Sequence, residues 1–277
     1  MSVKIVTDST SDIPVEVARD LGITVIPLNV HFDLDTFRDG VDIQPDQFYD
    51  RLLTSPNLPK TSAPAPGLFR ECYKRLLAEG DGIVSIHVST KLSGTYEAAM
   101  NARRDLGDES GIDVIDSRLA SMAAGLLVIS AAKAARRGAT RQEVVKLVKE
   151  SVDNVFVAVA LDTLEFMQKG GRVGKAQAML GSLLAVKPMI SLRDGEVVPL
   201  ERVRTRSKAI ARIGELLEQH LPAREVAVIY STGREEADRL IKRLETTHPG
   251  QGSYLARFGP ALGTYIGPDG LAVVTLN

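Results

Sequence analysis

The sequence has few of the features that mark secreted, membrane or nucleic-acid-binding proteins. Its 277 residues include one cysteine, Cys72, so no internal disulfide can form and a reducing compartment is expected. The formal net charge is −1, which favours neither a nucleic-acid nor a membrane-surface partner. The longest mostly apolar stretch, residues 119–132, is too short to cross a bilayer and predicts a buried helix.

The first residues also lack the apolar core of a signal peptide. Residues 3–7 predict a β-strand instead, and Asp8 follows directly. We therefore expect a cytoplasmic protein without stable membrane insertion, and a monomer is the default assumption.

The length and the order of predicted elements indicate two α/β domains. A chain of 277 residues exceeds one typical hydrophobic core. In the first half, strands are predicted at residues 3–7, 23–32, 82–89 and 112–116, and amphipathic helices separate them. This alternation is typical of a parallel sheet with helices on both faces, a three-layer α/β/α domain.

The second half changes its pattern. Asp194 and Gly195 join two predicted strands, residues 187–193 and 196–203, with the composition of a type I′ hairpin turn. A hairpin indicates a mixed sheet rather than a second all-parallel one. We therefore predict a parallel-sheet domain over residues 1–155 and a mixed-sheet α/β domain over residues 156–277.

Three loops rich in small hydroxyl residues each follow a predicted strand and precede a predicted helix. They are residues 8–12, residues 89–96, and Asp116-Ser117 with Ser121 one turn further on. Loops of a parallel sheet gather at the carboxyl ends of its strands, and helix N-termini there attract anions. Each loop alone is explained as well by ordinary helix capping, so an anion site and simple caps remain alternatives.

Other motifs are incomplete. Residues 169–175 resemble a P-loop, but Lys169 stands where the first glycine is required and Ala176 replaces the magnesium-binding hydroxyl. No Gly-x-Ser-x-Gly elbow and no metal-ligand spacing occur, so no catalytic and no metal residue is assigned. The four isolated histidines are expected to be surface or packing residues, and the acidic segment of residues 33–42 a solvated loop.

Several short phrases, taken in order, resemble the DegV family. They are TDSTSDIP at residues 7–14, KTSAP at 60–64, LSGTY at 92–96, DS at 116–117, KGGRV at 169–173, and VKP at 186–188 with Gly195 downstream. No single phrase is specific, but the ordered set is, and the resemblance extends from residue 5 to about residue 270.

The resemblance implies a long-chain fatty acid, such as palmitate or oleate, in a tunnel between and into the two domains. The best-understood members of the family are the acyl-binding B subunits of bacterial fatty acid kinase. In that system the partner kinase phosphorylates the bound carboxylate, and the B subunit does no chemistry. The resemblance thus implies a lipid-binding protein that is not an enzyme and needs no cofactor.

The family motifs also imply individual site residues. Thr61 and Ser93 match the hydroxyls that hold the carboxylate. Three further positions match their neighbours in the same motifs: Ser62, Gly94 and Thr95. Neutral hydroxyls and the free N–H groups of a helix start would stabilise a buried carboxylate and leave it nucleophilic.

Basic and aromatic positions are expected around the tunnel mouth. Arg172 matches the arginine of the Gly-Gly-Arg phrase, and Arg202 and Arg204 match positions suspected of docking the kinase. Tyr265 replaces the histidine usual in the family, and Asp269 replaces a glycine. Tyrosine donates a hydrogen bond but carries no positive charge near neutral pH, so these departures bear on kinase coupling more than on lipid binding.

An acyl tunnel also needs apolar walls. Candidates from the sequence are Leu164, Phe166, Met167, Met179, Leu180, Leu183, Leu184, Met189 and Ile190, each of which could equally be ordinary core. Two rival functions stay open. One is an acyl hydrolase or transferase with Ser93 as nucleophile, and the other is a regulatory module that senses lipid.

Overall fold

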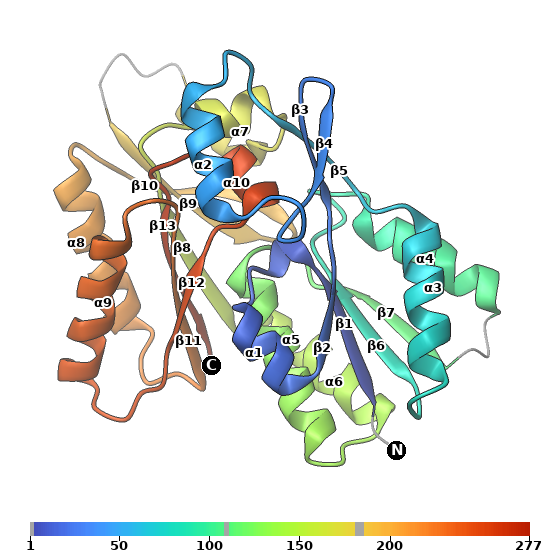
Figure 1. Ribbon diagram of the computed structural model, residues 1–277. Coiled ribbons are helices and arrows are strands. Elements are labelled where there is room, and N and C mark those ends of the chain that lie inside the picture. The colour runs from blue at the N-terminus through green and yellow to red at the C-terminus, as the bar shows by residue number, and fades with distance from the viewer. Residues whose placement is uncertain (1–2, 108–110, 181–185) are drawn as a thin grey trace.

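The computed structural model describes residues 3–107, 111–180 and 186–277 (Figure 1). Its first sheet is entirely parallel, as predicted. The strand order is β2 (Ile23–Ile26), β1 (Lys4–Asp8), β6 (Ile83–His87) and β7 (Ile112–Asp116). Helices α3 (Pro66–Leu77) and α4 (Thr95–Leu106) cover one face. The opposite face carries α1 (Val15–Leu21), α5 (Met122–Arg136) and α6 (Arg141–Ser151), which completes the predicted three layers.

The second sheet is mixed, which confirms the prediction for the second half. Its order is β10 (Glu196–Val203), β9 (Lys187–Arg193), β8 (Val155–Ala160), β13 (Leu271–Leu276), β11 (Glu225–Tyr230) and β12 (Tyr254–Arg257). Asp194 and Gly195 have φ values of 51° and 82°, and two successive positive φ values are what a type I′ turn requires. Helices α8 (Arg206–Gln219) and α9 (Arg234–Thr247) pack on the outer face.

A third, small sheet was not predicted. It is antiparallel, in the order β4 (Asp35–Arg38), β3 (Asn29–Phe32) and β5 (Lys60–Ser62). The prediction of one strand over residues 23–32 was therefore wrong. Pro27 lies between β2 and β3 and has no N–H to donate to a neighbouring strand, so the chain leaves the first sheet there. Helix α2 (Pro45–Thr54) packs on this small sheet through Phe48, Tyr49 and Leu52.

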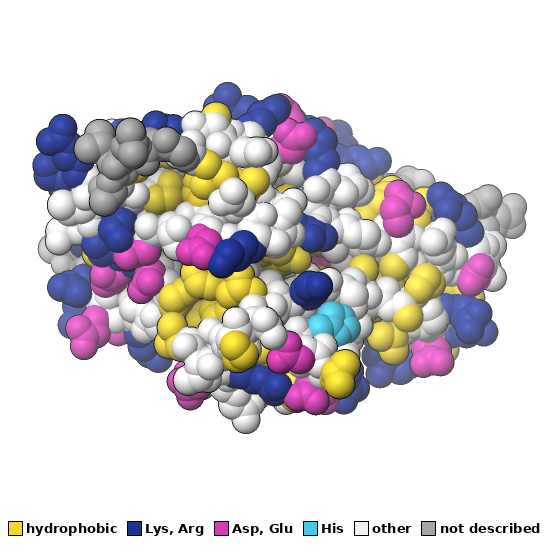
Figure 2. All heavy atoms as spheres, turned by 90° about the horizontal axis from the view of Figure 1, so that it is seen from above, with side chains coloured by type: hydrophobic (Ala, Val, Ile, Leu, Met, Phe, Trp, Pro, Cys, Tyr) yellow, Lys and Arg dark blue, Asp and Glu magenta, His cyan; other side chains and the backbone are white. Residues whose placement is uncertain are grey.

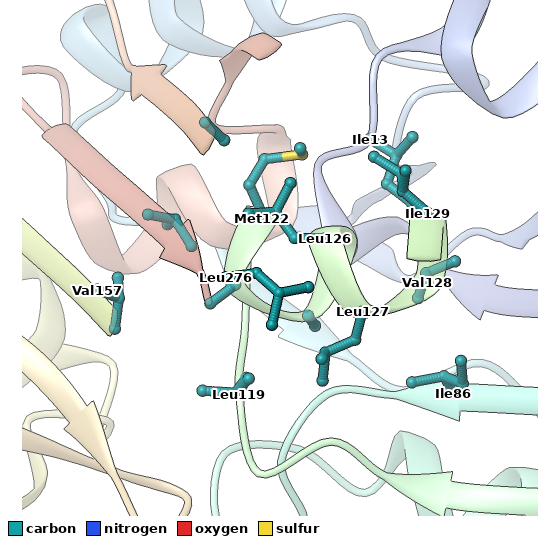
Figure 3. Close-up of a cluster of buried hydrophobic side chains, with 14 of the residues drawn as sticks. Ile13, Ile86, Leu119, Met122, Leu126, Leu127, Val128, Ile129, Val157 and Leu276 are labelled. Atoms are coloured by element: carbon teal, nitrogen blue, oxygen red, sulfur yellow. The ribbon is translucent and has the colours of Figure 1, made fainter. Parts of the chain in front are cut away.

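Helix α5 lies between the two large sheets and joins their cores. Figure 3 shows its side chains Met122, Leu126 and Leu127 among residues that come from both halves of the chain, such as Ile86 and Val157. Twelve of its fifteen residues are buried, and the polar residues Ser130, Lys133 and Arg136 lie in its last two turns, so most of the helix is core. Because one core crosses the expected boundary, the division at residue 155, where β8 begins, stays a prediction.

The shorter elements lie mainly around one end of the molecule. Helices α7 (Glu165–Lys169) and α10 (Pro260–Ile266) are close to α2 at the top of Figure 1. The described residues also form 3-10 helices at Ser9–Ser11, Val152–Asn154 and Gly174–Met179. In the part of the chain that the structure describes, no helix is both long and apolar enough to cross a membrane.

Candidate functional site: an apolar cavity with a polar mouth

A cavity of about 280 Å³ lies between the inner face of the six-stranded sheet and the carboxyl ends of the parallel strands. Its sheet wall consists of two adjacent rows of side chains. The outer row contains Ile190, Val159, Ala272 and Ile229, and the inner row contains Leu192, Val157 and Val274. Strand pairing sets these rows, because side chains two residues apart point to the same face of a strand.

The polar groups of the mouth come from three separate segments. Thr61 lies on β5, Ser93 follows β6, and Tyr265 lies on α10, and all three line the cavity. The hydroxyls of Thr61 and Tyr265 are 2.6 Å apart. The Ser93 Oγ lies 2.9 Å from the Thr95 Oγ1 and accepts a hydrogen bond of 3.3 Å from the Thr95 amide. The mouth therefore collects hydroxyl donors that two of the predicted motifs supply.

The helix that follows adds to this polarity. Gly94 occupies the N-cap position of α4, so the first amides of a 12-residue helix point toward the Ser93 loop. Gly94 is exposed and lines the cavity, whereas Thr95 is fully buried. Both were predicted at the site, and Thr95 acts there through Ser93.

Arg172 holds the tyrosine in place. Its guanidinium lies 5.3 Å from the centre of the Tyr265 ring and donates to the carbonyls of Leu92 at 3.3 Å and Gly170 at 2.8 Å. A Cβ at Gly170 would come within 2.5 Å of the Tyr265 ring, so only glycine lets the ring pack there. The Gly-Gly-Arg phrase thus positions Tyr265 at the mouth.

Other predicted residues are placed less directly. Ser62 lies on the rim, but its hydroxyl is 2.9 Å from the His31 Nε2 and 3.3 Å from the Asn29 Nδ2. Arg202 and Arg204 do not line the cavity, and Arg202 donates to the Ala178 carbonyl at 2.9 Å. Their role in partner docking stays a prediction.

Asp269 does not line the cavity either. Burial raises the pKa of its carboxyl, and the charge of Asp162 raises it further, while Arg206 and Lys187 oppose the shift. Asp269, which replaces a glycine of the family, therefore lies among charged side chains outside the cavity lining.

The sequence identified few of the apolar walls. Met167 and Ile190 line the cavity, whereas Leu164, Phe166, Met179, Leu180 and Met189 do not, and Leu183 and Leu184 lie outside the described residues. Met189 precedes Ile190 in β9 and therefore faces the opposite side of the sheet, toward α8. The wall residues that the sequence did not identify lie mainly on β8, β9, β11, β13 and α10. Apolar alternation along a strand predicts a buried face but does not show whether that face borders a cavity.

The loop over residues 8–12 does not form an anion site. The Asp8 carboxylate accepts hydrogen bonds from the Thr10 amide at 3.1 Å and the Val88 amide at 3.1 Å, and lies 2.9 Å from the His87 Nδ1. The Asp12 carboxylate accepts from the Gly259 amide at 2.9 Å and the Ser121 hydroxyl at 2.6 Å. The acidic side chains of Asp8 and Asp12 use the hydrogen-bond donors around them, so this loop stabilises the fold and does not offer those donors to an anion.

His87 is a packing residue, one of the two roles expected for the histidines: it is fully buried, its ring packs edge-on against Phe69, and Ser85 Oγ lies 2.7 Å from its Nε2. The expectation for the acidic segment was wrong. Asp39 is only 4% exposed and does not belong to a solvated loop. Burial raises the pKa of Asp39 to about 7, although hydrogen bonds from Ser9 and Ala261 oppose this, and burial also raises the pKa of Asp12 well above its usual range.

The third loop contributes one cavity residue. Ser121 lines the cavity and precedes α5 with φ 54° and ψ −154°, a conformation that residues other than glycine rarely adopt. Its hydroxyl is committed to Asp12, so it presents no free donor to the cavity. Ser117 is bonded locally to Leu119 and is a turn residue.

The surface around this end of the molecule carries both signs of charge. Figure 2 looks onto the end where Figure 1 places α2, α7 and α10, and hydrophobic side chains gather near the middle of that face. Lysine, arginine and acidic side chains surround them. Within residues 3–107, 111–180 and 186–277, no group of three or more His, Cys, Asp or Glu side chains could hold a metal ion.

The model of the DegV family matches residues 2–277. The chain belongs to the DegV family. Protein DegV of Bacillus subtilis is 36% identical over 278 residues, which cover 99% of this chain and 98% of that protein. A DegV domain-containing protein of Streptomyces coelicolor is 37% identical over 276 residues, 98% of this chain and 97% of that one.

Solved structures of this family have the same fold. A DegV family protein from Thermus thermophilus, described as binding fatty acid, superposes with a TM-score of 0.91 at 30% identity and full coverage of both chains. DegV from Bacillus subtilis, described as a fatty acid binding protein, gives 0.90 at 35% identity, with 100% of this chain and 99% of that one covered. A stearic-acid-binding protein from Eubacterium ventriosum gives 0.91 at 27% identity, with 99% and 98% covered.

Proposed function

We propose that this protein binds one long-chain fatty acid, with the acyl chain in the cavity and the carboxylate at the mouth. The observation that carries the proposal is that polar and apolar side chains lie in separate parts of the cavity. Apolar side chains form the sheet wall, whereas hydroxyl groups that pair only with other hydroxyls or a backbone amide are gathered at Thr61, Ser93 and Tyr265. The fatty acids named for the related solved structures support the same ligand class.

The energetics of the site suit such a ligand. Each buried methylene contributes about 0.8 kcal/mol, so a long chain gains on the order of 10 kcal/mol before the entropic cost of association, which takes back several kcal/mol. Without hydrogen-bond donors, moving the carboxylate from water into an apolar cavity would cost more free energy than the acyl chain gains. Hydroxyls at the mouth supply those donors, and each hydrogen bond to a charged group contributes about 1.5–3 kcal/mol.

We further propose that the protein presents its ligand to a fatty acid kinase and does no chemistry itself. Neutral donors leave the carboxylate free to act as a nucleophile. Gly94 and Arg172, both at the mouth, are exposed to solvent. Ser93 makes a poor enzyme nucleophile, because its hydroxyl pairs with the Thr95 hydroxyl, which is no general base. The Tyr265→His variant tests the coupling, since it restores the residue that the family resemblance implies.

Mass spectrometry tests the binding function first. Protein purified from a bacterial host and sprayed under native conditions should show an excess mass equal to one fatty acid, which denaturation releases. A protein that arrives without ligand, and takes up neither palmitate nor oleate on incubation, contradicts the proposal. Formation of acyl phosphate with a fatty acid kinase subunit and ATP then tests the handover.

A further inference from the structure

The inner end of the cavity shares its wall with a second depression, of about 540 Å³. Strand β8 shows the arrangement most directly, because Val159, Val157 and Val155 point to one face of the sheet. Val159 and Val157 line the cavity, while Val157 and Val155 line the depression. Successive side chains of one strand therefore lead from the first space into the second, and Val157 belongs to both.

Strand β9 repeats this pattern beside β8. Ile190 pairs with Val159 and lines the cavity, and Leu192, two residues further, lines both spaces. Leu192 pairs in turn with Val197 across the hairpin, and Val197 lines the cavity. Val157, Ser191 and Leu192 line both spaces, and the side chains of Val157 and Leu192 form the row that separates them at this end.

The row lies on the side of the cavity away from Tyr265 and Thr61. Strand β8 runs from Val155 to Ala160, and the chain then leads to Met167 in α7, which lines the cavity close to Tyr265. Val157 is therefore deeper than Val159. A fatty acid whose carboxylate lies at Thr61 would direct its methyl end toward Val157 and Leu192.

The two residues of the row differ in their freedom to move. Val157 is 4% exposed and β-branched, so it has one strongly preferred rotamer and close neighbours. Leu192 is partly exposed and has the open depression on its far side. Ser191 cannot move with it, because its hydroxyl donates to the Val157 carbonyl at 2.6 Å.

We propose that Leu192 sets the length of acyl chain that the protein accepts, as a movable end wall between the cavity and the second depression. The inference rests on the proposed function. A cavity of about 280 Å³ is small for a ligand site, since such sites commonly enclose roughly 300–1,000 Å³. The longest ligands need the space behind Leu192, where Leu119, Val152 and Val155 offer apolar contact beside charged groups such as Arg118 and Lys175.

The test is a competition among saturated fatty acids of increasing length. Delipidated protein is mixed with equal amounts of laurate, myristate, palmitate, stearate and arachidate, and the bound species are weighed by native mass spectrometry. Leu192→Ala should shift occupancy toward arachidate by about fourfold for each additional methylene that is buried. Leu192→Phe should shift it toward myristate and laurate.

Val203→Ala is the matched control, because Val203 lies on the same hairpin but lines neither the cavity nor the depression, and it should leave the length profile unchanged. Leu192→Met keeps the side-chain volume and should also resemble the unaltered protein. If the unaltered protein binds none of the five acids, the proposed function fails and the end wall with it. If it binds them, and both Leu192→Ala and Leu192→Phe keep its length profile, only the end wall is overturned.

Discussion

Two loops that look alike in the sequence have opposite roles in the structure. The loop after β1 and the loop after β6 both follow a parallel strand, both are rich in serine and threonine, and both lead toward a helix. In the loop after β6, Ser93 lies at the cavity mouth. In the loop after β1, Asp8 and Asp12 are buried and take the available donors for themselves.

The difference shows that hydroxyl content alone does not make an anion site. A serine or threonine has one proton to donate, and a neighbouring buried carboxylate uses it. Ser121 and Thr10 both line the cavity, yet their protons go to Asp12 and Asp8. Thr61 and Ser93 have only other hydroxyls and an amide as partners, so a ligand carboxylate can compete for their protons.

The largest effect is expected at the mouth. The Thr61→Ala, Ser93→Ala double variant removes two hydrogen bonds to the ligand carboxylate, each of about 1.5–3 kcal/mol, so affinity for palmitate should fall at least about 100-fold. Isothermal titration calorimetry measures it. Thr90→Ala is the control from the same loop, because the Thr90 hydroxyl donates to Asp116 at 2.7 Å. Equal affinity of the double variant and this control would refute the carboxylate assignment.

The second-largest effect is expected on stability, in the region of the loop after β1. Burial raises the pKa of Asp39 to about 7, whereas an unfolded aspartate has a pKa of about 4. Between these values the folded protein holds more protons at Asp39 than the unfolded chain, so the free energy of unfolding falls as pH rises. Asp39→Asn removes this loss. Near pH 8 its free energy of unfolding should be about 2–3 kcal/mol higher than that of the unaltered protein.

Urea unfolding at about pH 5 and about pH 8 checks this prediction. Asp42→Asn is the control, because the hydrogen bonds with Arg38 lower the pKa of Asp42 to about 2 and its carboxylate is charged at both pH values. That variant should gain no stability at the higher pH. A difference between Asp39→Asn and the unaltered protein that does not grow with pH would mean that Asp39 is not protonated in the folded state.

A third, smaller effect concerns Ser121, which belongs to both regions because it lines the cavity and donates to Asp12. Ser121→Ala leaves an Asp12 oxygen without its donor and should lower the free energy of unfolding by about 1–3 kcal/mol. Ser121→Gly loses the same bond but tolerates φ 54°, so it should lose about 1 kcal/mol less. Two variants of equal stability would show that the backbone conformation carries no strain.

The smallest effect is expected for Tyr265→Phe. The variant keeps the stacking with Arg172 but loses the hydroxyl that lies 2.6 Å from Thr61. One hydrogen bond of about 1 kcal/mol corresponds to a roughly fivefold loss of fatty acid affinity. A displacement assay with a fluorescent fatty acid resolves such a change, and unchanged affinity would mean that Tyr265 only covers the mouth.

Much of the fold could be predicted because local signals agree with the tertiary result. Alternating strands and helices predicted the parallel sheet, and Asp194-Gly195 predicted the hairpin of the mixed sheet. The small antiparallel sheet was not predicted because its three strands are short, and β5 pairs with β3 from some thirty residues away. Such pairing depends on how α2 and α10 pack around it, which no local pattern records.

The sequence by itself determined the fold class, the family and the hydroxyl groups at the mouth. The fold class depends on local periodicity, and the family and the hydroxyl groups depend on short motifs that occur in a fixed order along the chain. Only the tertiary structure decided which loop has hydroxyl groups available to a ligand and which loop uses them in internal hydrogen bonds. That choice depends on where Asp8, Asp12 and Asp39 are buried and on the contacts of Asp12 with Gly259 and Ser121, more than one hundred positions away. The shared wall at Val157 and Leu192 also has no local signal, since a cavity is the space that distant side chains leave between them.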